Sequence, residues 1–502
     1  MRKAFFNAAG WLLPVLVALA TTPLLIRELG TARFGVWAVS VMLAALIPTL
    51  DLGYGVAAVR ELARSRNDAP RLRQVTGELL TMALVLGALA WSVLTLGGGS
   101  ISGWLNFEKA IPREESLRLM ALLGPWAAVA FLNGALTALP RAQENFGVLA
   151  TIASLSSLGL WVGATGLAAM GADLPRLMSF GIVLQLLVFA ALALANRRIA
   201  GQWPRPTLRL KVLPRTSRFA LASFVGSLTS MATYHADKAL ISAFIGPAAA
   251  GLYTASANVA NKLLGLVASL GGVIYPRVST LHASGDGPQL ARIYFVSSRM
   301  LMTLTLALGI VGVVLAERFL MLWLGANVTP DLVLAFRLLI VAYVMASASV
   351  VASNILSGRG NAHRGAWFAA LGGAMTIAAG LLLIPRLGLL GAGWAGVIGM
   401  SQAVAFDFLM ERDLRAEHPQ LATSHRRPWI GWLVAGTITA LVGWAVAKWL
   451  PGWSGLLVGG ALALAAWCVV WFAAGFASPE ERLLAARLLK ATKDRLHDRK
   501  SA

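Results

Sequence analysis

The chain has 502 residues, of which 58% are hydrophobic and only 13% are charged, whereas a soluble domain is usually about 25% charged. Its mean hydropathy of +0.71 and its long apolar blocks exclude a string of soluble domains and predict one integral membrane unit. The formal charge of +21 does not indicate nucleic acid as a partner, because the basic residues lie between apolar blocks, where anionic lipid headgroups meet them, and no nucleic-acid-binding module is visible.

Fourteen apolar blocks are each long enough to cross roughly 30 Å of hydrocarbon at 1.5 Å per residue. The first follows Arg2 and Lys3 and resembles a signal peptide, but its run of about 23 residues exceeds an ordinary signal core of 7–15, so we expect it to be retained. The sequence therefore predicts an all-α polytopic membrane protein. The expected spans are 7–29, 35–57, 77–103, 117–139, 147–170, 176–196, 219–246, 250–275, 293–316, 331–356, 365–385, 388–410, 429–449 and 453–477.

The positions of lysine and arginine predict the orientation. With the N-terminus in the cytoplasm, about 30 of the 43 basic residues fall in cytoplasmic segments, which is the positive-inside pattern. Both termini are therefore expected in the cytoplasm. The expected division is a six-helix lobe (1–200), a basic linker (201–218), a second six-helix lobe (219–412), two further spans (429–477) and a cytoplasmic tail (478–502).

The tail begins with a helix-start signal. Ser478 followed by Pro479 and Glu481 has the form of a capping box with proline at the first helical position. An apolar stripe against lysines and arginines then predicts an amphipathic helix on the membrane surface, the alternative being a frayed, solvated tail. The residues of the stripe are Leu483, Leu484, Leu488 and Leu489.

An internal repeat relates residues 24–40 to residues 240–256. Four matched pairs carry it, namely Gly30 with Gly246, Gly35 with Gly251, Trp37 with Tyr253 and Ser40 with Ser256, and a weaker third copy has Gly388 with Gly393 and Trp394. Each copy is expected at the external turn between an odd and an even span. Six spans separate the first two copies, so a parallel repeat of two lobes is expected, with a substrate site at their interface. The alternative is a chance recurrence of glycine turns.

An ordered set of short motifs extends from about residue 7 to residue 410. In the first half it consists of Pro23-Leu24-Leu25-Ile26-Arg27-Glu28-Leu29-Gly30, Phe34-Gly35 and Leu50-Asp51-Leu52-Gly53-Tyr54-Gly55 followed by Arg60. In the second half it consists of Ala236-Asp237-Lys238, Gly251-Leu252-Tyr253, Tyr275-Pro276-Arg277-Val278-Ser279, Trp323-Leu324-Gly325, Asn354-Ile355-Leu356 and Leu383-Ile384-Pro385-Arg386-Leu387-Gly388.

With these motifs the chain resembles the oligosaccharide (O-antigen/exopolysaccharide) flippases of the polysaccharide transport family, in the multidrug/oligosaccharidyl-lipid/polysaccharide exporter (MOP) superfamily. The resemblance implies a V-shaped, MATE-like, two-lobed alternating-access transporter that turns undecaprenyl-pyrophosphate-linked oligosaccharides outward. It also implies contact with membrane lipids and with polysaccharide polymerase machinery. The chain is similar as well to lipid II flippases and, more distantly, to drug/cation antiporters.

Lys262 is the strongest candidate for a substrate-binding residue. A charge at mid-bilayer costs at least about 2.5–3.5 kcal/mol, and Lys262 lies about twelve residues into the eighth expected span, roughly 18–20 Å from either end. Its stem is too short to reach the interface. It is therefore expected to face a wet substrate cavity, the alternative being a structural ion pair.

Two further sets of charged residues in the expected spans each allow two interpretations. Asp237 and Lys238 lie roughly 12 Å from the external turn, with His235 two residues earlier. Either they form an internal ion pair, or Lys238 lines the cavity and Asp237 or His235 takes a proton. Arg27 and Arg337 are candidates for the same cavity, the role for Arg27 being favoured by the resemblance to lipid II flippases, with snorkelling to headgroups as the alternative.

The remaining charges are expected to have structural roles. Asp51 precedes two glycines and is expected to hold a loop arginine such as Arg60, or to couple transport to a cation. Arg299 is expected as an interfacial anchor. Asp407 and Glu78 are expected to be solvated.

Charge also suggests how transport is driven. A pyrophosphate carries about two negative charges, which lysine and arginine can pair, and moving them outward down an inside-negative potential gains about 4–5 kcal/mol per 100 mV. No cofactor and no metal are expected, and coupling to H⁺, to Na⁺ or to the membrane potential alone stays open. The alternative function is a cation-coupled multidrug or lipid II exporter. No catalytic residues are expected, because the loops are too short for an enzyme site.

Overall fold

A computed structural model describes residues 2–66, 68–208, 217–272, 274–424, 428–483 and 486. Within these ranges all regular structure is helical, and eleven helices are long and apolar enough to cross a membrane. An all-α, multi-pass membrane protein is therefore confirmed. The long helices are α1 (Arg2–Leu46), α3 (Ala69–Leu96), α5 (Arg113–Ala142), α6 (Phe146–Ala169), α7 (Leu174–Ala200), α8 (Ser217–Phe244), α9 (Pro247–Gly271), α11 (Gly287–Leu324), α12 (Pro330–Gly358), α13 (Ala362–Leu387), α14 (Leu389–Glu417), α16 (Trp429–Trp449) and α17 (Gly452–Ala473).

The shorter helices lie at turns and breaks between the long ones. They are η1 (Ile47–Leu50), α2 (Tyr54–Arg64), α4 (Gly98–Trp104), η2 (Phe107–Lys109), α10 (Ile274–Ala283), η4 (Gly325–Asn327) and α15 (Pro419–Ser424).

The eleven candidate spans differ from the fourteen expected ones for identifiable reasons. The first candidate, Val15–Leu50, contains a non-helical residue at Gly30 (φ 76°, ψ 159°), so it joins two helices across a break. Helices α8 and α9 have 28 and 25 residues, but their polar side chains lower their hydropathy, and they are not among the eleven. The number fourteen stays a prediction.

The helix that contains the third expected span begins well before that span. The third span was expected from residue 77, but α3 begins at Ala69, eight residues earlier, and ends at Leu96. The carboxylate of Asp68 accepts a hydrogen bond from the backbone N–H of Arg71, which caps the helix start. The basic first turns hid this start from a search for apolar residues.

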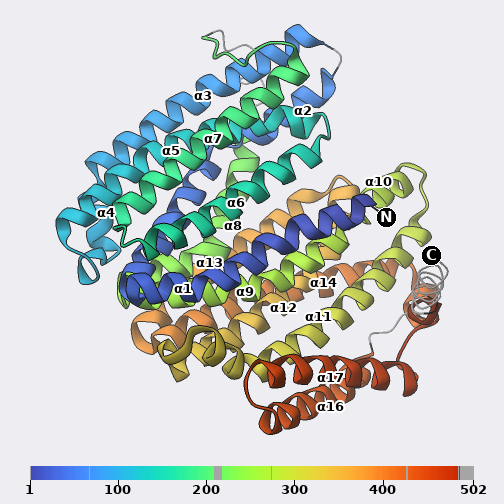
Figure 1. Ribbon diagram of the computed structural model, residues 1–502. Coiled ribbons are helices and arrows are strands. Elements are labelled where there is room, and N and C mark those ends of the chain that lie inside the picture. Colours follow the sequence, from blue (N-terminus) through green and yellow to red (C-terminus); the bar gives the residue numbers. More distant parts are fainter. Residues whose placement is uncertain are drawn as a thin grey trace, which may run out of the picture. The chain divides into compact units, whose positions relative to one another are not determined.

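The chain divides into two compact units, residues 1–255 with 380–389, and residues 256–379 with 390–502. In the first unit, α3, α5 and α7 lie side by side (Figure 1). They share a core in which Leu72, Val75 and Leu139 are almost completely buried. The six-plus-six-plus-two division of the sequence stays a prediction.

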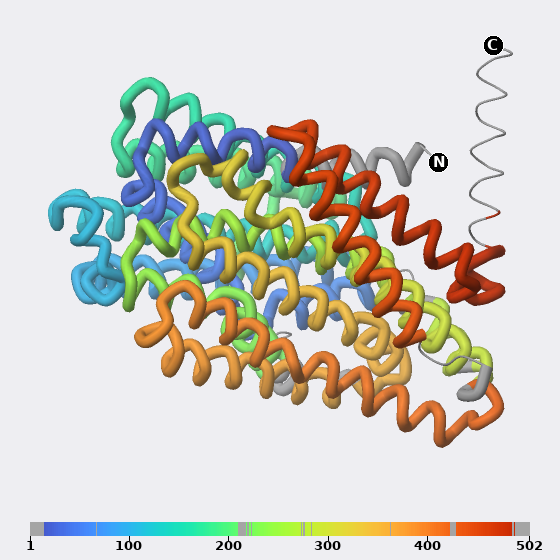
Figure 2. Tube along the Cα trace, turned by 90° about the horizontal axis from the view of Figure 1, so that it is seen from below, coloured from blue at the N-terminus to red at the C-terminus, as the bar shows by residue number. Residues whose placement is uncertain are grey.

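In the second unit, α16 and α17 form an antiparallel pair (red in Figure 2) that packs on α11. Tryptophans fill this interface, since Trp432, Trp467 and Trp471 are all nearly buried. The Trp467 and Trp471 rings stack with centroids 6.0 Å apart. The indole N–H of Trp432 donates to the Thr303 hydroxyl at 2.9 Å. Large apolar rings with one polar atom are well suited to hold two such helices against a third.

The copies of the repeat share a backbone conformation, and the first two also share a buried aromatic residue. Gly30, Gly246 and Gly388 all end a helix with positive φ, at 76°, 133° and 59°, a conformation that glycine adopts without steric cost. The matched aromatic residues Trp37 and Tyr253 are 1% and 0% exposed. The prediction that each copy lies at a turn between two helices is confirmed, while the side of the membrane stays a prediction.

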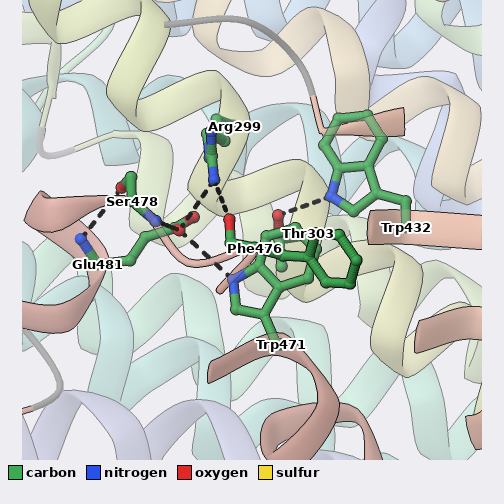
Figure 3. A network of polar contacts seen from close by, with 7 residues as sticks. All are labelled: Arg299, Thr303, Trp432, Trp471, Phe476, Ser478 and Glu481. Atoms are coloured by element: carbon green, nitrogen blue, oxygen red, sulfur yellow. Dashed lines mark hydrogen bonds and ion pairs between the residues drawn. The ribbon is translucent and has the colours of Figure 1, made fainter. Parts of the chain in front are cut away.

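A network of polar contacts ties the start of the tail to α11 (Figure 3). The Arg299 guanidinium donates to the backbone oxygen of Phe476 and pairs with Glu481 at 3.4 Å, both side chains being largely buried. It also lies 5.9 Å from the ring centroid of Trp471, whose indole N–H donates to Glu481 at 3.4 Å. The protein itself therefore supplies the partners of Arg299, and its expected place at the membrane interface stays a prediction.

The capping box at the start of the tail is confirmed. The backbone N–H of Ser478 donates to the Glu481 carboxylate at 2.6 Å, and the backbone N–H of Glu481 donates to the Ser478 hydroxyl at 3.3 Å. The same carboxylate thus caps the helix and pairs with Arg299. Of the expected amphipathic helix, Leu483 is described, and Leu484, Leu488 and Leu489 lie outside the described residues.

Removing Arg299 is expected to destabilise the second unit. In an Arg299→Ala variant the Glu481 carboxylate remains largely buried without its cation, which costs about 3 kcal/mol or more. The expected result is a fall in the thermal unfolding midpoint of the detergent-purified protein, measured by tryptophan fluorescence. Arg292→Ala is the control, since Arg292 pairs with Glu480 at the exposed surface. Equal midpoints for the two variants would contradict the role of Arg299.

Candidate functional site

Lys262 lies on an exposed polar face of α9. The exposed residues Asn258, Asn261, Lys262 and Ser269 share this face because residues three, four and eleven positions apart lie on one side of a helix. Within the part of the chain that the structure describes, Lys262 has no ion pair and no hydrogen bond. The alternative of a structural ion pair is therefore not supported.

The depth of Lys262 determines what its surroundings must be. It lies fifteen residues after Pro247 and nine before Gly271, which is roughly 22 Å and 14 Å along the helix. An exposed ammonium this far from both helix ends is too costly to face hydrocarbon. Lys262, with two amides beside it, fits a water-filled cavity that accepts an anionic group and neighbouring hydroxyls.

Asp237 and Lys238 form a buried, fully bonded pair within α8. The Lys238 ammonium pairs with the Asp237 carboxylate at 3.0 Å and donates to the backbone oxygen of Tyr234 at 2.6 Å. The second carboxylate oxygen of Asp237 accepts a hydrogen bond from the Tyr253 hydroxyl at 2.9 Å. The Lys238 and Asp237 side chains are only 4% and 8% exposed. Of the two sequence-based alternatives, this geometry favours the internal ion pair over a cavity role for Lys238.

His235 stays a candidate proton acceptor without a bonded partner. Its Nδ1 atom is buried and has no hydrogen-bond partner in the described part of the chain. The side chain lies two residues before Asp237, so the two are on different faces of α8. In the described part of the chain, no hydrogen bond of the His235 Nδ1 atom therefore joins it to the pair.

Breaking the pair is expected to destabilise the first unit. Lys238→Met leaves a buried carboxylate without its cation, which costs about 3–5 kcal/mol, whereas Tyr253→Phe removes one hydrogen bond worth about 1 kcal/mol. The unfolding midpoint of the purified protein is expected to fall much further in the first variant. Asp237→Asn combined with Lys238→Met is expected to recover most of the loss. If the double variant is no more stable than Lys238→Met, the loss does not come from an unpaired carboxylate.

Arg27 and Arg337 both have carboxylate partners near helix ends. The Arg27 guanidinium pairs with Glu28 at 2.8 Å and its side chain is 76% exposed, three residues before the break at Gly30. Arg337 pairs with Glu317 at 3.4 Å and donates to the backbone oxygen of Val313 at 3.2 Å. The cavity role of both residues stays a prediction.

Asp51 holds a helix break rather than a loop arginine. Its two carboxylate oxygens accept hydrogen bonds from the backbone N–H groups of Gly53 and Gly55, both at 2.8 Å. Leu52 and Gly53 have φ of 54° and 77°, which separates η1 from α2. The expected partner Arg60 is therefore wrong, because two N–H groups at the start of α2 are nearer to the carboxylate along the chain.

The repeat brings its own equivalent residues together within the first unit. A Cβ added to Gly251 would lie 2.5 Å from the Cα of Gly35, and one added to Gly35 would lie 1.9 Å from the backbone oxygen of Pro247. The backbones of α1 and α9 therefore touch where the copies match. Only glycine permits this approach.

A second close approach joins α2 and α8. A Cβ added to Gly53 would lie 1.9 Å from the backbone oxygen of Ala220. Gly53 follows Gly35 by eighteen residues, which comprise the last part of α1, η1 and the break at residues 51–53. The two glycine contacts therefore lie near opposite ends of the second expected span.

Two acids expected in solvent are buried. Glu78 is 0% exposed and accepts a hydrogen bond from the Gln74 side chain at 3.1 Å. Asp407 is 1% exposed and accepts one from the Tyr294 hydroxyl at 2.7 Å. The expectation of solvation is wrong because protein groups supply the donors, namely Gln74 one turn earlier on α3 for Glu78 and Tyr294 on α11 for Asp407.

Sequence reasoning missed Asn258 and Asn261. The signal was present, since polar residues at positions 258, 261 and 262 share one helical face in an otherwise apolar segment. A criterion based on charge alone does not select asparagine side chains.

The fold is that of MOP-superfamily transporters. A solved structure of the lipid II flippase MurJ in an inward closed conformation matches with a TM-score of 0.74 at 12% identity, covering 94% of this chain and 100% of that one. An inward-facing multidrug resistance MATE transporter of the MOP superfamily matches with a TM-score of 0.63 at 16% identity, covering 81% and 96%. At these identities the likeness concerns the fold alone.

The sequence comparisons define the family. The model of the polysaccharide biosynthesis protein family matches residues 1–282, and the chain belongs to that family. A protein of Shigella flexneri named as a candidate O-antigen transporter is 22% identical over 335 residues, covering 65% of this chain and 77% of the relative. The resemblance noted in the motifs is confirmed.

Proposed function

We propose that the protein is a flippase that moves undecaprenyl-pyrophosphate-linked oligosaccharide repeat units from the cytoplasmic to the periplasmic leaflet. The observation that carries the proposal is the exposed Lys262 deep in α9, in a member of the polysaccharide biosynthesis family. A lysine is a suitable point charge for a phosphate. The flanking amides of Asn258 and Asn261 offer donors and acceptors for sugar hydroxyls.

The two glycine contacts support an alternating-access mechanism. The Gly35–Gly251 contact and the Gly53–Ala220 contact lie near opposite ends of one span and each joins helices from the two expected lobes. Opening one contact while the other stays closed gives access from one side at a time. The helix break held by Asp51 is a suitable hinge, because the backbone there has already left the helical ladder.

The driving force requires no resident cofactor. Two negative charges moving outward gain about 4–5 kcal/mol per 100 mV of inside-negative potential. Asp51, Asp237 and His235 are the candidates for H⁺ or Na⁺ coupling. In the structure Asp237 is committed to Lys238 and Asp51 to backbone N–H groups, which leaves His235 as the candidate for proton coupling beside the membrane potential.

Location and partners follow from the proposal. The protein is placed in the bacterial inner membrane with both termini in the cytoplasm, as the lysine and arginine distribution indicates. Membrane lipids and polysaccharide polymerase machinery are the expected partners, and nucleic acid is not. The relatives are transporters, consistent with a protein that performs no catalysis.

The alternative is a cation-coupled multidrug or lipid II exporter. Such a drug exporter is expected to hold an acidic cluster deep in its first lobe. The candidate acid there, Asp51, instead accepts hydrogen bonds from backbone N–H groups at a helix break. The test is movement of lipid-linked oligosaccharide from the outer to the luminal leaflet of proteoliposomes that hold the purified full chain, read as a loss of lectin binding on the outside of the vesicles. Translocation that requires the chain supports the proposal. Drug efflux without oligosaccharide translocation overturns it.

A further inference from the structure

A cavity of about 250 Å³ lies within the first unit, where η1, α2, α3 and α5 enclose it. Its α3 wall is apolar, with Met82 and Leu86 among the lining residues. The floor on α5 is made of small residues, because Gly134 and Ala138 lie on one face with Arg141. A Cβ added to Gly134 meets nothing within 4 Å, so the cavity is open space at that point.

Arg141 gives this cavity a charged end. It is exposed, and in the described part of the chain it has neither an ion pair nor a hydrogen bond through its side chain. Its neighbour Arg66, by contrast, pairs with Glu144 at 3.2 Å and donates to the backbone oxygen of Ala142 at 3.3 Å. Of these two neighbouring arginines, Arg141 is therefore the one available to a ligand.

Asp51 lines the same cavity but does not cancel this charge. Its two oxygens are each held at 2.8 Å by backbone N–H groups at the start of α2, whose partial positive charges offset the carboxylate. The Asp51 carboxylate and the Arg141 guanidinium line the same cavity from different elements and do not pair in the described part of the chain. A guanidinium that stays unpaired beside an apolar wall suits the phosphate of an amphipathic molecule.

We propose that this cavity binds a phosphate-bearing lipid, with its phosphate on Arg141 and its first methylenes along Met82 and Leu86. From Gly134 to Arg141 the α5 face spans seven residues, roughly 10 Å, so the cavity holds the phosphate end of a lipid and not its whole chain. The position near the end of α5, beside the basic segment 60–73, is where anionic lipid headgroups gather. The site is separate from Lys262 and does not depend on the proposed function.

The experiment measures lipid retained by the purified full chain in native mass spectrometry. Detergent-solubilised protein is incubated with dioleoylphosphatidylglycerol, with undecaprenyl phosphate or with inorganic phosphate. Arg141→Gln and Gly134→Leu are each expected to lower lipid retention at least fivefold, the second by filling the cavity. Arg141→Lys is expected to retain at least half. The control Arg176→Gln removes an equally exposed arginine at the start of α7, paired with Asp173, and is expected to change nothing.

The outcomes distinguish the two possible sources of the phosphate-bearing lipid. Variant-sensitive retention of either lipid supports the site, and the preferred lipid shows whether it is a membrane phospholipid or a polyprenyl carrier. Retention that is equal in wild type and Arg141→Gln overturns it, and so does inorganic phosphate that displaces the lipid at equal concentration. Because Arg141 is exposed, the Arg141→Gln variant tests the proposal even if Gly134→Leu does not fold. If the wild-type protein binds the lipid but does not transport oligosaccharide, that result counts against the proposed function alone.

Discussion

An alanine at position 262 is expected to reduce polysaccharide export by roughly two orders of magnitude while the protein still inserts in the membrane. Removing one partner of a desolvated charge pair typically costs about 2–5 kcal/mol, and in the described part of the chain Lys262 is not committed to any other group. The measurement is surface polysaccharide in a flippase-deficient strain that expresses the variant at wild-type level. Lys262→Arg keeps the charge and is expected to retain part of the activity.

The matched control for Lys262 is Lys448. Lys448 lies exposed near the end of α16, with its ammonium 5.3 Å from the ring centroid of Trp444, where a lysine side chain reaches the interface. Lys448→Ala is expected to leave export unchanged. Full complementation by Lys262→Ala would remove the main support for a cationic cavity, and a loss in both variants would point to net charge instead.

A leucine at position 251 is expected to hold apart the two copies of the repeat. Even a Cβ at Gly251 lies 2.5 Å from the Cα of Gly35, and backbone atoms cannot yield as a flexible side chain can. Transport is expected to fall at least tenfold, because the contact near that end of the second expected span cannot close. Gly35→Leu, which meets the backbone oxygen of Pro247 at 1.9 Å, is expected to have the same effect.

Labelling tests whether this loss is an opening or an unfolding. Ser40, which is 0% exposed, is changed to cysteine in a Cys468→Ser background, since Cys468 is the only cysteine of the chain. A membrane-impermeant maleimide is expected to label Ser40→Cys faster when Gly251→Leu is present. Gly166→Leu is the control, because a Cβ there meets nothing within 4 Å. Wild-type transport by Gly251→Leu would show that the contact does not need to close.

Membrane character and helix positions were predictable because hydropathy acts over whole segments. The turns at Gly30, Gly246 and Gly388 were predictable too, since a helix that ends with positive φ strongly favours glycine. The start of α3 was not, because its first turns are basic and only the cap of Asp68 marks them. Length and apolar content alone do not locate a helix end that lies in a basic segment.

The candidate site was predictable only in part. The depth of Lys262 follows from counting residues, so a functional charge there could be inferred. Whether Lys238 faces a cavity or a carboxylate depends on the rotation of α8. It depends also on the Tyr253 hydroxyl, which lies sixteen residues after Asp237 in the next helix and donates to its carboxylate. The burial of Asp407 likewise depends on tertiary packing, which brings the Tyr294 hydroxyl of α11 to its carboxylate. Such pairings are three-dimensional facts that periodicity does not contain.

The contact between Gly35 and Gly251 has a consequence for how such a chain could have arisen. Equivalent positions of two copies touch each other, which is the property of an isologous interface, in which one patch meets its own image across a two-fold axis. A half-length ancestor could therefore have formed the same contact between two separate chains before its gene was duplicated and fused. In such a homodimer every substitution at this position acts twice, whereas in the fused chain one copy is free to change, as Trp37 and Tyr253 already differ.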